Sequence, residues 1–253
     1  MFPYRDENVT LRTPIATIAL IVVTVGVWIL VQGGGSTLAV AESVCNYGLV
    51  AAELTRSAPP GTAFPMGEGL ACVIDAGSQP EHLVTHVFLH GSWMHLLGNM
   101  WFLWIFGNNV EDSMGRSRFV VFYLACGLVA ALVQVWMTPS SGAPMVGASG
   151  AISGVMGGYV VLYPFVRVFV LLPLGFFITT VALPAWTMIG YWGLLQLLSG
   201  VGSLGAESVG GVAFWAHLGG LVAGVFLVPL FARRDYVEEH RAQHWAPSRY
   251  GWR

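Results

Sequence analysis

The sequence predicts an all-α, polytopic membrane protein with six transmembrane helices and both chain ends in the cytoplasm. Hydrophobic residues make up 55% of the 253 residues, charged residues make up 9%, and the mean hydropathy is +0.68. A soluble domain carries roughly 25% charged residues, so a membrane protein explains this composition better than a large globular core does. The net charge of -2, without a basic stripe carrying interleaved aromatic residues, gives no indication of nucleic-acid binding.

Each expected span is a mostly apolar stretch close to the roughly 20 residues that a membrane crossing needs. The expected helices cover residues 14–31, 86–110, 119–137, 149–164, 178–198 and 214–231. Residues 168–199 are long enough for two spans, but Pro173 and Pro184 interrupt them, so we expect an interfacial lead-in followed by one helix. The first stretch lacks a small-residue cleavage site at its end, which favours a true span over a signal peptide.

The arginines predict the orientation. With six spans and a cytoplasmic N-terminus, only Arg56 among the 11 basic residues lies outside, as the positive-inside rule requires. The expected parts are a cytoplasmic segment at 1–13, a membrane domain at 14–231 with a long outside loop at 33–81, and a cytoplasmic tail at 232–253. We expect partial structure in the loop and contact of the Arg-bearing tail with anionic membrane lipids.

The 3 cysteines are too few for a disulfide scaffold. Cys126 lies in an apolar span, where we expect it to pack as a small hydrophobic residue. Cys45 and Cys72 share the outside loop, and they can pair if that loop faces an oxidising compartment. Their spacing fits no zinc pattern. We expect no metal and no other cofactor.

Polar residues on three expected helices fall at one depth in the membrane. Counted from the cytoplasmic end of their own helices, His95, Asn99, Ser149 and His217 lie about 12–16 residues in, which corresponds to roughly 18–24 Å. Ser149 stands in the first turn of a short helix, where the helix dipole and free N–H groups favour an oxyanion. A serine and a histidine are costly in lipid, and a nucleophile with its base accounts for both.

Small residues recur at every fourth position on two of these helices. Gly150 and Gly154 lie four residues apart just after Ser149, and Gly220 and Gly224 repeat that spacing just after His217. Such stripes let helix backbones approach closely in lipid, which would bring the serine and the histidine into hydrogen-bond reach. Taken singly, a membrane serine more often bonds back to a carbonyl, and a glycine more often packs than serves catalysis. The shared depth and the stripes together favour the catalytic interpretation.

Two further groups leave alternatives open. His82, His86 and His90 fall at i, i+4 and i+8 and could share a helix face as metal ligands do. No acid of the HExxH kind accompanies them, so we favour hydrogen bonds to loops over metal binding. Glu111 ends the second expected helix, where an exposed charge cluster and a buried carboxylate bonded to a neighbouring helix are equally compatible with the sequence.

These residues together resemble the bacterial rhomboid family of intramembrane serine proteases. The matching pieces run in the family's order from about residue 82 to 231, and they are His95-Leu96-Leu97-Gly98-Asn99, Gly107, Glu111, Gly147-Ala148-Ser149-Gly150 and Ala216-His217 with Gly220 and Gly224. The resemblance implies a six-helix bundle that holds a Ser–His dyad without a required aspartate.

On the matching positions, the resemblance implies that Ser149 is the nucleophile and His217 the general base, then the acid for the leaving amine. The oxyanion would be held by the Asn99 amide, by His95 and by the Ser149 N–H. The remaining matches are expected to support the site, namely Gly147, Gly150, Gly154, Gly220, Gly224 and Glu111.

The sequence departs from the family at two places. Glu81-His82 stands where some members carry a Trp-Arg pair, and Ser153 stands where an aromatic residue sometimes stacks on the histidine. Since no carboxylate partner is evident, we expect packing alone to orient His217.

The expected activity is cleavage of transmembrane segments of other membrane proteins through an acyl-enzyme. The resemblance implies a multi-pass protein of the bacterial inner membrane that cleaves near the outer side, with the fifth helix as the gate for substrates. The alternative is a non-catalytic rhomboid-like protein that binds membrane clients, although such proteins usually lack the serine or the histidine. A transporter is disfavoured because no internal repeat is visible. The sequence leaves the oligomeric state open.

Overall fold

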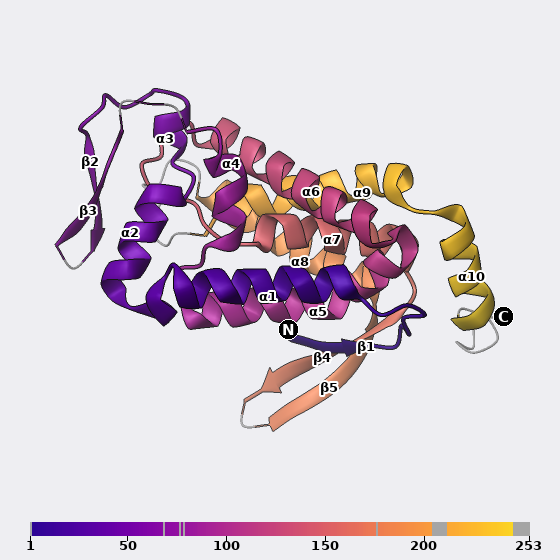
Figure 1. Ribbon diagram of the computed structural model, residues 1–253. Helices are drawn as coiled ribbons and strands as arrows, with labels where there is room; N and C mark the ends of the chain where they lie inside the picture. The colour runs from indigo at the N-terminus through magenta and orange to yellow at the C-terminus, as the bar shows by residue number, and fades with distance from the viewer. Residues whose placement is uncertain are drawn as a thin grey trace.

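The computed structural model describes residues 2–67, 69–75, 77, 79–175, 177–203 and 212–244. Six helices of 14 to 22 residues overlap the expected spans and lie lengthwise beside one another, as Figure 1 shows. They are α1 (Ile15–Leu30), α5 (Trp93–Met114), α6 (Arg116–Met137), α7 (Ser149–Leu162), α8 (Ala185–Gly202) and α9 (Phe214–Phe231). By length and composition alone, α6 and α9 are the two described helices that could cross a membrane, while α1 and α7 are apolar but shorter.

The core of the bundle surrounds α7. Phe106 of α5, Phe122 and Tyr123 of α6 and Tyr159 of α7 are fully buried there. The ring of Phe106 meets that of Tyr159 edge to face at a centroid distance of 5.1 Å. Because α7 is buried from Gly150 to Tyr159, its first residue is held in a fixed place relative to the helices around it.

Glycines set the contact between α7 and α9. A Cβ added at Gly220 would lie 2.0 Å from the backbone oxygen of Gly150, and one at Gly224 would lie 1.9 Å from that of Gly154. Gly154 in turn faces Cys126, which is buried and unpaired. No side chain fits at these positions, so the two backbones touch directly.

The start of the second expected helix is wrong. Residues 82–88 form the short α4 (His82–Thr85) and the 3-10 turn η2 (His86–Phe88), and Leu89 is extended. Helix α5 begins only at Trp93, after Ser92, whose Oγ accepts a hydrogen bond from the His95 N–H at 3.2 Å. A serine cap satisfies a free N–H of the first turn, which fixes the start of the helix there.

The all-α expectation is also wrong for the segment before α1, for the segment between α7 and α8, and for part of residues 33–81. Strands β1 (Phe2–Asp6), β4 (Arg167–Leu174) and β5 (Phe177–Pro184) form an antiparallel sheet in the order β1-β4-β5, beneath α5 in Figure 1. The fifth long helix therefore starts at Ala185 rather than 178. Gly175 adopts φ 63° at the hairpin turn, and an interior proline disfavours a helix, so strand pairing satisfies these backbone groups instead.

Residues 33–81, the expected outside loop, contain η1 (Gly33–Gly35), α2 (Thr37–Tyr47), α3 (Ala51–Leu54), β2 (Ala63–Gly67) and β3 (Leu70–Val73), so the expectation of partial structure in this segment is confirmed. Cys45 of α2 and Cys72 of β3 form a disulfide with a Cα–Cα distance of 5.4 Å. The bond ties the β2–β3 hairpin to α2 at one end of the bundle (Figure 1).

Glu111 is buried and bonded to a neighbouring helix. Its carboxylate accepts hydrogen bonds from the Ala16 N–H at 2.9 Å, the Thr17 N–H at 2.7 Å and the Thr17 hydroxyl at 2.8 Å. These donors belong to the first turn of α1, whose N–H groups have no partner within the helix. Of the two alternatives for Glu111, the buried carboxylate is the one observed.

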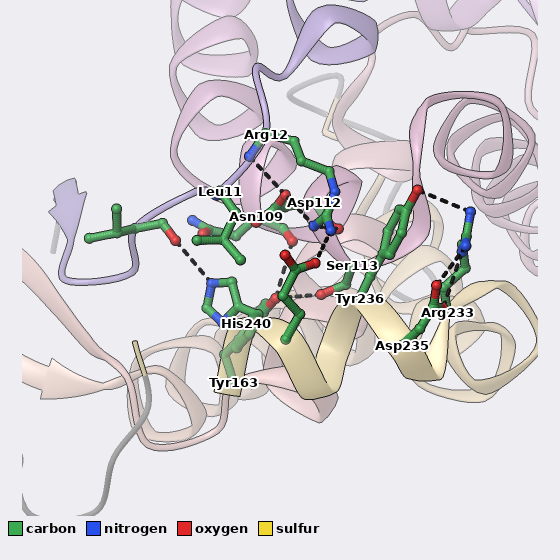
Figure 2. Close-up of polar contacts among 12 residues, drawn as sticks. Leu11, Arg12, Asn109, Asp112, Ser113, Tyr163, Arg233, Asp235, Tyr236 and His240 are labelled. Carbon is green, nitrogen blue, oxygen red and sulfur yellow. Dashed lines mark hydrogen bonds and ion pairs between the residues drawn. The ribbon is translucent and has the colours of Figure 1, made fainter. Parts of the chain in front are cut away.

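The tail returns to the bundle as helix α10 (Arg234–His244). Arg12 pairs with Asp112 at 3.2 Å and with Glu239, and it stacks on the Tyr236 ring at 3.7 Å from the centroid. His240 donates from Nε2 to the Val9 carbonyl at 3.0 Å, and Figure 2 shows these contacts gathered between α10, the N-terminal segment and the end of α5. The segment at residues 9–12 and helix α10 therefore meet at one end of the bundle, whereas Phe2 stacks on Trp101 further along α5. Residues 245–253 of the expected tail lie outside the described residues.

Candidate active site

Ser149 is the first residue of α7, at the end of a loop that runs into the molecule. The loop is held by a pair of backbone hydrogen bonds between Met145 and Leu49, at 2.8 and 3.0 Å, and by one from the Gly147 N–H to the His86 carbonyl at 2.9 Å. Gly147 adopts φ 122°, a conformation that side chains disfavour. The serine hydroxyl thus stands at a helix N-terminus, and the loop that leads to it is held in one conformation.

His217 lies in the first turn of α9 and meets Ser149 directly. Its Nε2 is 2.8 Å from Ser149 Oγ, although 68 residues separate the two in the chain. The start of α9 is held by Gln134 of α6, whose side-chain oxygen accepts the Ala216 N–H at 3.1 Å. Both Ser149 and His217 are half-buried, so neighbouring side chains surround the pair but leave part of it accessible.

The other nitrogen of His217 has a partner that sequence reasoning missed. His217 Nδ1 lies 2.8 Å from the side-chain oxygen of Gln196 on α8, and the Trp192 ring lies 5.8 Å from the imidazole centroid. The expectation that packing alone orients His217 is therefore wrong. An amide inside an apolar helix, one turn after a tryptophan, is the signal that could have found it.

Ser153 is bonded away from the imidazole. Its hydroxyl donates to the backbone oxygen of Ser149 at 2.6 Å, one turn earlier in α7. In this conformation the Ser153 hydroxyl bonds within the first turn of α7, so side chains of α8 contact the His217 ring instead.

His95 and Asn99 lie beside the loop that precedes the serine. A Cβ added at Gly147 would lie 2.7 Å from His95 Cε1 and Nε2 and 3.6 Å from Asn99 Nδ2. His95 Nδ1 accepts the Gly91 N–H at 3.5 Å, which leaves the proton on Nε2. Asn99 Nδ2 donates to His90 Nε2 at 2.9 Å. The four side chains expected at one depth therefore gather around residues 147–149.

The three histidines at i, i+4 and i+8 do not share a helix face, because α4 ends at Thr85. His86 Nδ1 donates to the His82 carbonyl at 2.8 Å, and His90 binds Asn99 through its ring. Within the described part of the chain, no group of three His, Cys, Asp or Glu residues is arranged to hold a metal ion.

Fold and site together define a class: a helical bundle in which a serine at a helix start contacts a histidine from another helix. The chain belongs to the rhomboid family, since the Rhomboid domain model matches residues 77–234. Members of this family are integral membrane proteins and are usually intramembrane serine proteases, although some are inactive. All the candidate site residues lie within the matched range.

Three relatives illustrate the similarity. The chain is 34% identical over 154 residues to Rhomboid-like protein 11, chloroplastic, of Arabidopsis thaliana, covering 59% of this chain and 52% of the relative. It is 28% identical over 150 residues to Rhomboid protein 1, mitochondrial, of Saccharomyces cerevisiae, covering 56% and 39%. It is 30% identical over 182 residues to Presenilin-associated rhomboid-like protein A, mitochondrial, of Danio rerio, covering 67% and 44%.

The chain thus spans about half or less of the length of these relatives. Their names place them in chloroplasts and mitochondria, so the expectation of a bacterial protein in a bacterial inner membrane finds no support in them. The family assignment itself is confirmed.

Proposed function

We propose that this chain is an intramembrane serine endopeptidase that cleaves transmembrane segments of other membrane proteins. The observation that carries the proposal is the 2.8 Å contact between Ser149 Oγ and His217 Nε2, made between two helices. Nucleophile and base within hydrogen-bond reach are the arrangement that activates a hydroxyl of otherwise weak nucleophilicity. Family membership supports the reaction class, since most rhomboid proteins are proteases.

In the proposed reaction, the Ser149 oxygen attacks the scissile carbonyl while His217 Nε2 takes the hydroxyl proton. The same proton then passes to the leaving amine. In the second half of the reaction, His217 takes a proton from water as it attacks the acyl-enzyme and returns that proton to the Ser149 oxygen. One amide hydrogen of Asn99 is used by His90, which leaves the other for the oxyanion, together with His95 Nε2–H and the Ser149 N–H. The free N–H groups at the start of α7 form the positive end of the helix dipole, which also stabilises the oxyanion.

The proposal includes the expected topology of six spans with both ends in the cytoplasm. The contacts of α10 with Val9 and Arg12 support this topology, because an even number of crossings brings the segments before the first span and after the last span to one side. Arginines concentrate on that side in the proposed arrangement, in accord with the positive-inside rule. Membrane lipids are then the surroundings of the bundle and of its substrates.

The proposal also keeps α8 as the gate. Leu194, Leu195, Leu197, Leu198 and Val201 in its second half are 41–60% exposed, so few contacts resist its displacement. A substrate helix that unwinds readily would present an extended strand to Ser149 past this segment.

The test is cleavage of a labile transmembrane substrate by purified protein in lipid bilayers. Wild type should cleave it, whereas Ser149→Ala and His217→Ala should lose activity by about 10³-fold or more. Ser203→Ala is the matched control, because its hydroxyl only closes the end of α8 on Gly200, and it should keep wild-type activity. Equal cleavage by wild type and Ser149→Ala would refute the protease. Binding without cleavage by wild type would favour a client-binding protein.

A further inference from the structure

Gln196 selects the protonation site of His217. Its side-chain oxygen lies 2.8 Å from His217 Nδ1, and a carbonyl oxygen can only accept a hydrogen bond. The Nδ1 therefore carries the proton, and the neutral imidazole presents a lone pair at Nε2. That nitrogen lies 2.8 Å from Ser149 Oγ, so the bond to Gln196 leaves His217 in the tautomer that can accept the serine proton.

We propose that Gln196 is the positioning residue of the dyad and that it makes the base competent only while α8 lies against α9. The proposal rests on the proposed function of Ser149 and His217. When Ser149 transfers its proton to Nε2, the ring becomes an imidazolium with hydrogens on both nitrogens, and Gln196 continues to accept from Nδ1. Its amide then takes the orienting part that a carboxylate takes in a triad, without adding a buried negative charge.

The packing of α8 makes this bond depend on the position of the helix. The side chains that α8 buries in its first half are Ala185, Met188 and Ile189, and the Ala185 N–H donates to the Val166 carbonyl at 2.8 Å. The second half meets α9 through a stripe at four-residue spacing, formed by Trp192, Gln196 and Gly200. Swinging that half outward would remove Gln196 from His217 and release the ring.

Two substitutions of Gln196 separate positioning from packing. Gln196→Met keeps length and shape but removes the amide oxygen, and it should lower kcat about 10–100-fold with an unchanged KM, as loss of a histidine-orienting partner does elsewhere. Gln196→Glu restores an oxygen acceptor and should recover most of kcat. Leu132→Met, at a side chain 47% exposed on α6, is the control and should match wild type. Wild-type kcat in Gln196→Met, or equal loss in both Gln196 variants, would overturn the proposal.

Nitrogen-15 NMR of labelled histidines gives a readout that needs no proteolysis. With the His217 signal identified by its loss in His217→Ala, wild type and Ser149→Ala should show the Nδ1–H tautomer, and Gln196→Met should show a mixture. An Nε2–H tautomer in wild type, or no change on substitution, would contradict the positioning. A tautomer that depends on Gln196 in a protein without cleavage would instead refute the proposed function and leave the positioning standing.

Discussion

Single polar side chains hold this bundle together because each satisfies donors that its helices leave open. Glu111 closes the first turn of α1, and Gln134 closes that of α9. A free N–H in a lipid environment costs several kcal/mol, so a side chain that accepts from a helix start stabilises both the helix and the contact. Gln196 acts in the same manner on a ring nitrogen rather than a backbone N–H.

Replacing Glu111 tests this at the residue scale. In Glu111→Gln an amide group faces N–H donors where a carboxylate oxygen accepted them, so the free energy of unfolding should fall by about 1–3 kcal/mol. Unfolding of the purified protein in detergent measures the change. Asp235→Asn, at an exposed carboxylate paired with Arg233, is the matched control and should leave stability unchanged. A Glu111→Gln protein as stable as wild type would show that the bonds to α1 contribute little.

At the scale of the elements, the contact of α7 with α9 determines the geometry of the site. Gly150 and Gly220 bring the two backbones together one residue after Ser149 and three residues after His217. Any separation of the helices at this level would lengthen the bond between serine and histidine. In the proposed protease, these glycines would therefore be needed for the geometry of the site as well as for helix packing.

Gly220→Ala should separate the two helices. Its Cβ would lie 2.0 Å from the Gly150 oxygen, which cannot yield without a backbone shift, so we expect a loss of about 1–3 kcal/mol in stability. Proteolysis per folded molecule should fall at least tenfold. Gly190→Ala on α8 meets nothing within 4 Å and should be neutral or slightly stabilising. Comparable behaviour of the two variants, in thermal unfolding and cleavage, would contradict the close-contact account.

A helix could be predicted from the sequence where a long apolar run is bounded by polar or irregular segments. The expected 214–231 matches α9, because Phe214–Phe231 lies between polar or irregular segments. The hairpin of β4 and β5 was missed since an apolar run in a sheet and one in a membrane helix have the same hydropathy. What decides between them is pairing with β1, more than 160 residues earlier in the chain.

The candidate site could be predicted only in part, because some of its residues depend on contacts between distant segments. Ser149 and His217 stand out as polar residues at one depth in apolar segments. Gly147 belongs to the Gly147-Ala148-Ser149-Gly150 motif. Gln196 has no such marker, because its role depends on which face of α8 meets α9. The use of one Asn99 hydrogen by His90 likewise follows from the chain turning at Leu89, which separates His90 from the helix expected there.

At the scale of the whole molecule, residues 6–12 and helix α10 close one end of the bundle. Strand β1 lies beside β4, and its Asp6 accepts hydrogen bonds from the Tyr159 hydroxyl at 2.6 Å and from Asn109 Nδ2 at 3.0 Å. Arg12 contacts α10 at the same end, as Figure 2 shows. Segments from both termini thus fix the ends of α5 and α7, far along the helices from Ser149.

Asp6 predicts the pH dependence of this closure. Burial raises the pKa of Asp6 from 3.8 to about 7, against the hydrogen bond from Tyr159, which lowers it. Between about pH 4 and 7 the folded protein then holds a proton that the unfolded chain has released, so stability should fall as the pH rises through this window. Asp6→Asn should flatten that slope in unfolding measured at several pH values. An unchanged slope would show that Asp6 ionises normally.

The most direct test of the central claim is labelling of the protein in bilayers with a fluorophosphonate, followed by peptide mass spectrometry. Activation of Ser149 by His217 predicts an adduct on Ser149 that forms in wild type and at a rate reduced by orders of magnitude in His217→Ala. No adduct on Ser149, or one that forms equally fast without the imidazole, would contradict it.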